Sequence, residues 1–343
     1  MKKNYSLFGM PEKIKYCTKC VISNQRPNAI IEFESKNTFE KQGITFENNN
    51  ICSACKFNEI KETKINWEER NKQLEILCDK YRKKSGYDVI VPSSGGKDSG
   101  YVSHILKYKY KMNPLTVTWA PHLYSDIGWK NLQSFISVGG FDNVLFTPNG
   151  KLHRLLTSLA FKNLLHPFQP FIIGQKMIGP LIALKFDVPF VMFGENNAEY
   201  GNNLDDNFKP EMDEKFFSNQ NIENIYLGGK SISALLKDNE FNLNDFTPYI
   251  PPKLEDLKKK KIEVHFFSYY KKWDPQESYY YAFDKTGFKP NTERTEGSYS
   301  KYSSIDDKID DFHYFTTYIK YGLGRASYDA SQEVRCGKIT REE

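Results

Sequence analysis

A glycine-rich loop that follows a short apolar segment constrains the fold of this chain more than any other feature. The apolar segment, residues 87–92, has the length and β-branched content of a buried strand. The loop consists of Ser94, Gly95, Gly96, Lys97, Asp98 and Ser99. The paired glycines allow a sharp turn, and Asp and Ser are residue types that begin helices. A strand, a glycine turn and a helix start together form an anion site, because unpaired N–H groups and the positive end of the helix dipole meet there.

The spacing of this loop separates two classes of phosphate-binding protein. A Walker loop needs a glycine, four further residues and then Gly-Lys followed by Ser or Thr, and residues 94–99 do not have that pattern. The loop instead resembles the SGGxDS loop of the ATP pyrophosphatases, which split ATP into AMP and pyrophosphate while they adenylate a substrate oxygen. The alternative interpretation is a plain Gly/Ser turn between a strand and a helix.

Apolar and amphipathic segments alternate through the rest of the chain. We expect strands near 87–92, 114–119, 143–146, 188–193 and 262–267, and helices near 98–112, 126–138, 151–165 and 175–186. This alternation predicts an α/β fold, a parallel sheet covered by helices, of the adenine nucleotide alpha hydrolase type that the loop resemblance implies. Ligands of such sheets bind beyond the carboxyl ends of the strands. The rule groups the glycine loop with residues at the carboxyl ends of two other strands, which are Thr118, Trp119, Gly194, Glu195 and Asn196.

Four of the six cysteines have the spacing of metal ligands. They form two C-x-x-C pairs, which are Cys17 with Cys20 and Cys52 with Cys55. Tetrahedral zinc takes four thiolates, and a hairpin of residues 30–33 and 43–46 would bring the two pairs together. We therefore expect a structural Zn²⁺ site with no open position; an iron–sulfur cluster or unliganded cysteines are the alternatives. The remaining cysteines, Cys78 and Cys336, are expected to be structural.

Composition limits the compartment and the class of partner. The chain has 343 residues, of which 39% are hydrophobic, and this suits a large globular core. It has no run of about 18 apolar residues, so no membrane span is expected. The first residues lack the apolar core of a signal peptide, so we expect a cytoplasmic protein. The net charge of +5 is a small excess for this length and does not require a nucleic-acid partner.

Three regions are expected along the chain. Residues 1–60 would form the four-cysteine module, residues 61–260 the α/β domain, and residues 261–343 a strand and helical region that completes the active site. Within the second region, residues from about 201 to 260 are polar and rich in turns, as in a long insertion. This insertion is interpreted either as a cover over the substrate or as an excursion on the surface.

Six features together resemble the N-acetyl sugar amidotransferase family over nearly the whole chain. They are the cysteine pairs and the segments 94–99, 118–122, 194–201, 272–277 and 320–327. Enzymes of this family convert the acetamido group of a sugar into an acetamidino group, for bacterial surface polysaccharides and for flagellin glycans with nonulosonic acids such as legionaminic and pseudaminic acid. The resemblance implies ATP, Mg²⁺ and structural Zn²⁺ as cofactors. It also implies an N-acetylated sugar nucleotide or nonulosonic acid as substrate.

The family's reaction consumes ammonia, for which this chain has no recognisable source. Position 2 is Lys, and no cysteine has a Gly-flanked elbow with a downstream His-x-Glu. The resemblance therefore implies a separate glutaminase and a cyclase-like subunit that channels ammonia.

The resemblance assigns ATP to the glycine loop and its neighbours. The phosphates would be bound by Gly95, Gly96 and Ser99, with help from Ser94, and the nucleotide would also contact Thr118, Trp119 and Gly194. Asp98 would hold Mg²⁺ or cap the helix, and Lys97 would reach a phosphate or extend into solvent. Lys320 and Arg325 resemble a basic pair that binds pyrophosphate, with plain surface charge as the alternative.

The acceptor would lie next to the nucleotide. Glu195 and Asn196 would bind sugar hydroxyls or orient the amide, with a structural turn as the alternative. Asp274 would contact the substrate or belong to an ordinary Trp-Asp-Pro turn. His122 follows a strand end and is the histidine most suited to the site. Glu195 joins Lys97, Asp98 and the basic pair as a catalytic candidate.

Other functions fit parts of the same pattern. The strongest rival is a tRNA base-modifying enzyme, of the thiolation or lysidine type, which would adenylate a base carbonyl. A relative of the sulfate reductases and a zinc-ribbon binding protein with a degenerate nucleotide domain are further alternatives. The small positive charge and the absence of a Lys/Arg-rich arm disfavour tRNA.

Overall fold

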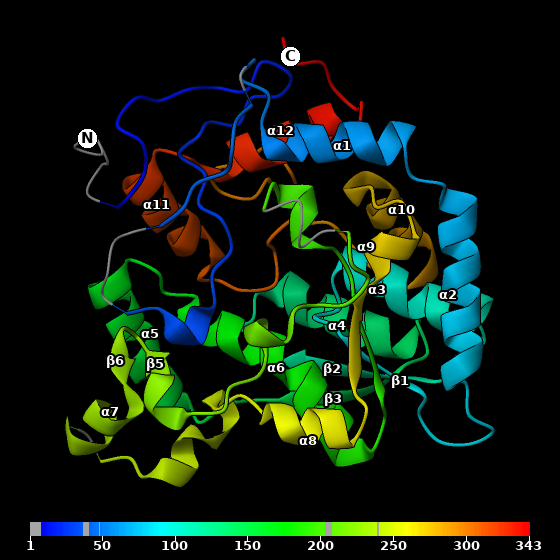
Figure 1. Cartoon of the computed structure of the whole chain (residues 1–343), viewed down its shortest axis with the longest axis vertical. Helices are drawn as coiled ribbons and strands as arrows, with labels where there is room; N and C mark the ends of the chain where they lie inside the picture. The colour runs from blue at the N-terminus through cyan, green and yellow to red at the C-terminus, as the bar shows by residue number, and fades with distance from the viewer. Residues whose placement is uncertain (1–7, 37–40, 48, 203–207, 239) are drawn as a thin grey trace.

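A five-stranded parallel sheet forms the centre of the protein (Figure 1). The computed structural model describes residues 8–36, 41–47, 49–202, 208–238 and 240–343. The sheet has the order β3-β2-β1-β4-β7, and its strands are β1 (Val89–Pro92), β2 (Pro114–Trp119), β3 (Asp142–Phe146), β4 (Phe190–Phe193) and β7 (Glu263–Phe266). The order reverses between β1 and β4, because β2 and β3 lie on one side and β7 on the other. Ligands bind at such a reversal, beyond the carboxyl ends of the strands.

Helices surround this sheet. The α-helices are α1 (Ser53–Thr63), α2 (Trp67–Tyr81), α3 (Lys97–His104), α4 (Asp126–Ser137), α5 (Gly150–Leu164), α6 (Gln169–Phe186), α7 (Ile232–Asp238), α8 (Leu254–Lys259), α9 (Phe267–Tyr270), α10 (Pro275–Lys285), α11 (Asp310–Tyr321) and α12 (Arg325–Arg335). A π-helical turn, η2 (Ile105–Lys109), extends α3. The 3₁₀ turns include η1 (Glu32–Glu34), η3 (Asn197–Tyr200), η5 (Glu214–Phe216), η6 (Ile222–Asn224) and η7 (Leu243–Tyr249).

The alternation of side chains along β1 explains why helices cover both faces of the sheet. Successive strand residues point to opposite faces. Val89 and Val91 pack on one face with Leu74 of α2 and Val102 of α3. Ile90 packs on the other face, in the cluster that contains the apolar side chains of α6. The expected α/β class with five parallel strands is therefore confirmed.

The four-cysteine module packs against the C-terminal helices rather than against the sheet. Its cysteines share a core with Leu323 and Val334, and Figure 1 shows α1 beside α12. The expected hairpin of residues 30–33 and 43–46 is wrong, because Glu32–Glu34 form the turn η1. The second segment instead pairs with residues before the first one, in an isolated bridge between Pro27 and Gly43.

The segment from 201 to 260 belongs to the main core. Its described residues form α7, α8, short 3₁₀ turns and the two-stranded pair β5 (Tyr226–Leu227) and β6 (Lys230–Ser231). Phe217, Leu227, Phe246 and Tyr249 are buried among the side chains of the largest hydrophobic cluster. Residues 208–238 and 240–260 are therefore neither a surface excursion nor a wall of the cavity described below. The polar run at 203–207 lies outside the described residues.

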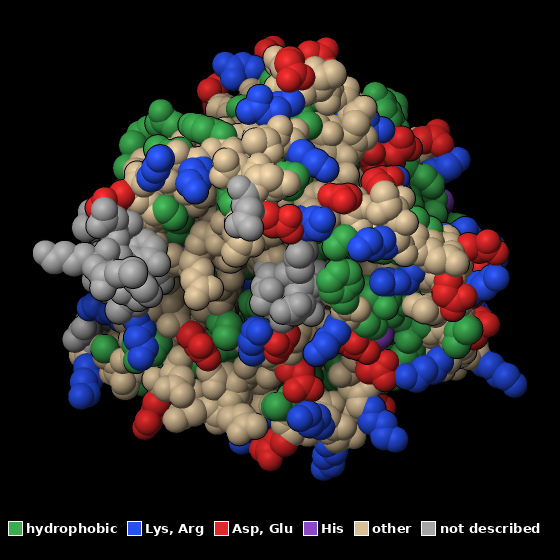
Figure 2. Space-filling model, turned by 45° about the horizontal axis from the view of Figure 1, so that its top comes forward, with side chains coloured by type: hydrophobic (Ala, Val, Ile, Leu, Met, Phe, Trp, Pro, Cys, Tyr) green, Lys and Arg blue, Asp and Glu red, His purple; other side chains and the backbone are tan. Residues whose placement is uncertain are grey.

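The surface is mixed in charge. Figure 2 shows Lys and Arg interspersed with Asp and Glu over the face in view. Within the described ranges, no helix is both long enough and apolar enough to span a bilayer.

Candidate active site

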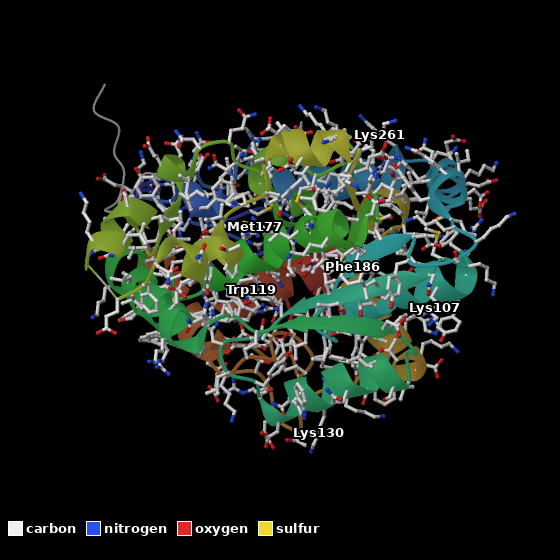
Figure 3. The ribbon with its side chains drawn as sticks, turned by 90° about the horizontal axis from the view of Figure 1, so that it is seen from below. Lys107, Trp119, Lys130, Met177, Phe186 and Lys261 are labelled. Carbon is white, nitrogen blue, oxygen red and sulfur yellow. The ribbon has the colours of Figure 1, made fainter. Side chains whose placement is uncertain are left out.

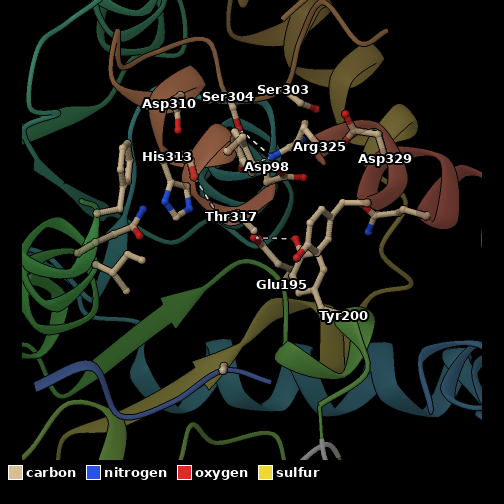
Figure 4. A pocket seen from close by; sticks show the side chains of 18 of the residues that line it. Asp98, Glu195, Tyr200, Ser303, Ser304, Asp310, His313, Thr317, Arg325 and Asp329 are labelled. Carbon is tan, nitrogen blue, oxygen red and sulfur yellow. Dashed lines mark hydrogen bonds and ion pairs between the residues drawn. The ribbon is translucent and has the colours of Figure 1, made fainter. Parts of the chain in front are cut away.

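A cavity of about 620 Å³ lies at the carboxyl ends of β1 and β4 (Figure 4). Its walls include the glycine loop, the segment after β4, parts of α4, α11 and α12, residues between 165 and 175, residues 302–307, and residues 22–32 and 41 of the four-cysteine module. The cavity thus occupies the reversal of strand order, where an α/β sheet of this kind binds its ligand. Segments from both ends of the chain are needed to enclose it.

The glycine loop presents the start of α3 to this cavity. Gly95 has φ +80°, and a Cβ there would lie 2.6 Å from the Cα of Leu132, so only glycine fits. Gly96 is the N-cap of α3 and has no side chain to satisfy the first N–H groups of the helix. Those groups therefore stay available for an anion. Residues 94–98 line the cavity, whereas the hydroxyl of Ser99 donates to the carbonyl of Gly96 at 3.2 Å.

Lys97 and Asp98 form an ion pair at the cavity wall. The indole N–H of Trp273 donates to Asp98 Oδ1 at 3.0 Å, and the Lys97 ammonium lies 6.0 Å from the centre of the same indole ring. Asp98 is the second residue of α3, after the Gly96 cap, so it does not cap the helix. Its carboxylate is held toward the cavity by Trp273, which belongs to the segment 272–277 but was given no role in the site from the sequence.

Glu195 faces the glycine loop from the segment after β4. The hydroxyl of Tyr200 donates to Glu195 Oε1 at 3.3 Å, and Figure 4 shows the two side chains together. Burial, together with the nearby charge of Asp98, raises the pKa of Glu195. A carboxyl group with a raised pKa in a cavity is suited to exchange a proton with a ligand bound there.

The neighbours of Glu195 have structural roles instead. Gly194 accepts a hydrogen bond from the Ser268 N–H through its carbonyl at 3.0 Å. Asn196 is the N-cap of η3 and accepts from the Ala198 N–H at 3.0 Å. Neither Gly194 nor Asn196 lines the cavity. The structural-turn interpretation of Asn196 fits this geometry better than contact with a sugar.

The structure places Thr118 and Trp119 in the core and not at the cavity, contrary to expectation. Thr118 accepts a hydrogen bond from the Asn143 side chain at 3.0 Å. Trp119 packs between the sheet and α6 (Figure 3), directly over Gly174, where a Cβ would lie 2.2 Å from the indole. The close approach of α6 at this glycine covers the end of β2, which removes both side chains from the site.

Two other expected substrate contacts lie behind the cavity wall. His122 Nδ1 is 3.0 Å from Asp307 Oδ2, and the ring lies against Phe168; its main-chain N–H also donates to Asp307. Asp274 is the N-cap of α10 and pairs with Lys338 at 3.3 Å, as in the ordinary-turn interpretation. Neither His122 nor Asp274 lines the cavity.

Lys320 and Arg325 both line the cavity but do not form a pair. Arg325 is anchored by Asp329 Oδ1 at 2.9 Å, by Ser304 Oγ at 2.8 Å and by the Tyr314 hydroxyl. Lys320 instead donates to the carbonyl of Leu164 at 2.8 Å. The two cations therefore belong to different parts of the cavity.

Acidic side chains on the C-terminal wall escaped the sequence analysis. Asp306, Asp307 and Asp310 line the cavity. Burial and the charges of the other two raise the pKa of Asp310 to about 8. Burial also raises the pKa of Asp306, and a hydrogen bond from Ser94 opposes that rise. The clustered aspartates before α11 were a signal for this wall, although they also suit an ordinary helix start.

The four cysteines lie together in an arrangement that could hold one metal ion. Their sulfur atoms all lie within 4.8 Å of one another, and the pairs Cys17–Cys55 and Cys20–Cys52 are 3.8 and 3.7 Å apart. A zinc tetrahedron with Zn–S bonds near 2.3 Å has sulfur–sulfur edges of about 3.8 Å, so these side chains fit Zn²⁺. Among the described residues no second cluster of three His, Cys, Asp or Glu side chains meets the same criterion.

The metal module is tied to the segment after β4. The hydroxyl of Ser53 donates to the carbonyl of Gly201 at 2.6 Å, and Arg26 donates to the carbonyl of Tyr200. Arg335 of α12 donates to the carbonyl of Glu199 at 3.1 Å. The module thus holds the segment that carries Glu195 and Tyr200.

The fold and the site define a parallel-sheet α/β protein with a glycine loop at an uncapped helix start and a four-cysteine module beside it. Residues 296–343 match the family model described as "LPS biosynthesis protein WbpG-like, C-terminal domain". This match contains α11 and α12, which form one wall of the cavity. A comparison with curated proteins finds no match.

Two solved structures are similar to the chain. The U34-tRNA thiolase NcsA from Methanococcus maripaludis, with its 4Fe-4S cluster, matches with a TM-score of 0.34 and 14% identity, over 93% of this chain and 88% of that one. The NMN synthetase from Francisella tularensis matches with a TM-score of 0.32 and 10% identity, over 80% of this chain and 94% of that one.

Proposed function

We propose that this protein is an ATP-dependent amidotransferase, which converts the N-acetyl group of a sugar nucleotide or nonulosonic acid into an acetamidino group. The observation that carries the proposal is that one cavity joins the glycine loop at α3 to the C-terminal wall. That wall lies in the region matching an LPS-biosynthesis domain. An ATP site and an acceptor site would then share one enclosed space.

The chemistry requires two steps, because an amide oxygen is a poor leaving group. The oxygen of the N-acetyl group attacks the α-phosphorus of ATP, pyrophosphate departs, and the amide nitrogen loses its proton to give an O-adenylyl imidate. Ammonia then adds to the imidate carbon, AMP departs, and a proton is lost to leave the neutral amidine. Pyrophosphate gains negative charge as it departs, so its stabilisation lowers the barrier to the first step.

The residues around the glycine loop suit this first step. The N–H groups at the start of α3 and the ammonium of Lys97 would bind the phosphates. Asp98 would hold Mg²⁺, since a cavity-facing carboxylate together with phosphates is a common magnesium environment. The ion would neutralise charge on the departing pyrophosphate.

Glu195 is the proposed proton acceptor. It lies across the cavity from the C-terminal wall, with Tyr200 as hydrogen-bond partner, and its raised pKa suits it to take a proton from ammonium or from the adding ammonia. The ammonia would come from a separate glutaminase through a cyclase-like subunit. The four-cysteine site, which has no open coordination position, would hold Zn²⁺ in a structural role.

The test is pyrophosphate release from ATP in the presence of ammonium chloride. The acceptors are a panel of N-acetylated nucleotide sugars, free nonulosonic acids and bulk tRNA, each analysed afterwards by mass spectrometry. The proposal predicts a sugar in which NH has replaced oxygen, formed in step with AMP. A modified tRNA with unchanged sugars would overturn the proposal and assign the chain to tRNA modification.

A further inference from the structure

The cavity has a second charged end, distant in the chain from the glycine loop. Three segments build it: residues Glu32 and Lys41 from the four-cysteine module, His166 after α5, and His313 and Lys320 on α11. Figure 4 shows His313 and Thr317 on the α11 side of the cavity, with Glu195 and Tyr200 on the other side. The proposed ATP chemistry uses none of the residues of this second end, which are Glu32, Lys41, His166, His313 and Lys320.

Positive charge at this end exceeds the negative charge that faces it. Glu32 Oε2 lies 3.3 Å from His166 Nε2, and the fields of His166 and Lys41 lower the pKa of Glu32 to about 2 against the effect of burial. Glu32 is therefore ionised. In the described part of the chain, no carboxylate lies within 4.0 Å of the ammonium of Lys41 or of Lys320.

Burial makes this arrangement unfavourable without a ligand. Desolvation and the neighbouring Lys41 lower the pKa of Lys320 to about 7, and burial also lowers the pKa of Lys41. Two half-buried ammonium groups in one cavity stabilise a bound anion, because it supplies the opposite charge that water no longer provides.

An unused polar atom lies at the same place. The Nδ1 atom of His313 is buried and has no hydrogen-bond partner, although its ring is held against Phe168 and near His166. Burial lowers the pKa of His313 to about 3, so the ring is neutral and offers one donor or acceptor. Buried polar atoms are almost always satisfied in native proteins, which points to a ligand group at this position.

We propose that Lys41 and Lys320, with His313 beside them, bind an anionic group of the acceptor, either a carboxylate or a phosphate. This assignment rests on the proposed function and gives Lys320 a different role from the pyrophosphate contact expected from the sequence. ATP would occupy the glycine-loop end, and the acceptor would reach from its anionic group to the loop. Arg325, held by Asp329 and Ser304, also lines the cavity.

The test is direct binding, which does not depend on turnover. Equilibrium dialysis of the full chain would use two probes: UDP-N-acetylglucosamine, which has phosphates and no carboxylate, and N-acetylneuraminate, which has a carboxylate and no phosphate. The variants are Lys41→Ala, Lys320→Ala and Lys320→Arg, with Lys162→Ala as a control, because Lys162 is an exposed lysine of α5. Thermal melting of each variant would establish that it is folded.

We expect at least one of the two probes to bind the wild-type chain. The probe that binds shows whether the site takes a phosphate or a carboxylate. Each alanine variant at Lys41 or Lys320 should weaken that probe about tenfold or more, since loss of a charge-assisted contact costs roughly 1.5–3 kcal/mol. Lys320→Arg and Lys162→Ala should stay within about threefold, and the affinity for ATP should not change. The absence of binding by both probes, equal binding by the variants, or a loss of ATP affinity in Lys320→Ala would each overturn it.

The two proposals can fail separately. Loss of probe affinity in the lysine variants without any amidine product would leave the anion site standing and remove the amidotransferase. Amidine formation with an unchanged KM for the acceptor in both alanine variants would support the amidotransferase and remove the anion site.

Discussion

The ammonium of Lys61 and the carboxylate of Glu199 form an ion pair of 2.9 Å, and only 2% and 6% of the two side chains are exposed. Lys61 belongs to α1 of the four-cysteine module and Glu199 to η3 after β4. Lys61 also donates to the carbonyl of Trp273 at 3.2 Å, and the indole of Trp273 holds Asp98. One buried cation therefore connects the metal module to two walls of the cavity.

Removal of Lys61 should destabilise the protein strongly. Lys61→Met leaves Glu199 buried without its partner, and breaking such a pair costs about 3–5 kcal/mol in the free energy of unfolding. The double variant Lys61→Met with Glu199→Leu should recover most of that loss, because it leaves no unpaired charge. Urea unfolding of the three proteins measures the difference; a double variant as unstable as the single one would contradict this explanation. Turnover should stay low in the double variant, since the contact to the Trp273 carbonyl is still missing.

Substitution of Gly95 tests the glycine loop, and Gly86, which lies outside the loop, is its matched control. Their φ angles are +80° and +78°, but a Cβ at Gly95 would lie 2.6 Å from Leu132 Cα, whereas a Cβ at Gly86 would have no atom within 4 Å. Gly86→Ala should cost about 1–2 kcal/mol, the price of the left-handed backbone alone. Gly95→Ala should cost more and should also abolish ATP binding, because the backbone must move away from α4. Denaturant unfolding and ATP titration of both variants check this, and equal losses would refute it.

Removal of the metal should impair the cavity as well as the module. A chelator, or Cys52→Ser, should release a single zinc ion per chain and lower the Tm. It should also raise the KM for ATP, since the module holds η3 beside Glu195, and the KM for the acceptor, since the module supplies Lys41 to the cavity. Elemental analysis and melting curves measure the first two effects. Iron and acid-labile sulfide in the purified protein would instead assign an iron–sulfur cluster.

Asp310 should make the stability fall as the pH rises. Its pKa is raised to about 8 by burial, Asp306 and Asp307, with Arg325 opposing, from an ordinary value of 3.8. Between these two values the folded chain keeps a proton that the unfolded chain has lost, so the free energy of unfolding decreases from about pH 4 to about pH 8. Asp310→Asn cannot ionise and should remove this contribution. Unfolding curves across that range, compared between wild type and variant, test the sign; identical slopes would refute it.

The local parts of the fold and site were predictable from the sequence. The expected strand at 114–119 coincides with β2, and the glycine loop lies where a strand, a turn and a helix start were expected. These features depend on residues that are neighbours in the chain, such as Gly95 and Asp98. The two C-x-x-C pairs were predictable for a similar reason, because each pair fixes half of a metal site by itself.

The errors come from contacts between distant segments. Trp119 is the last residue of β2, as expected, but Gly174 allows α6 to cover its indole ring. No residue near Trp119 in the sequence indicates this contact. Lys320 and Arg325 are close in the chain, yet a helix end at Gly322 turns them to different parts of the cavity. The contribution of Lys41 to the same cavity depends on how the metal module docks, which no spacing pattern encodes.

The shared core of the four-cysteine module and α12 has a consequence for any shortened form of the protein. The cavity takes residues from the module and also Arg325 and Asp329 from α12. A fragment without either part would expose the apolar face of the other and leave the cavity open to solvent. We therefore expect no partial activity from a fragment that keeps the sheet and the glycine loop alone.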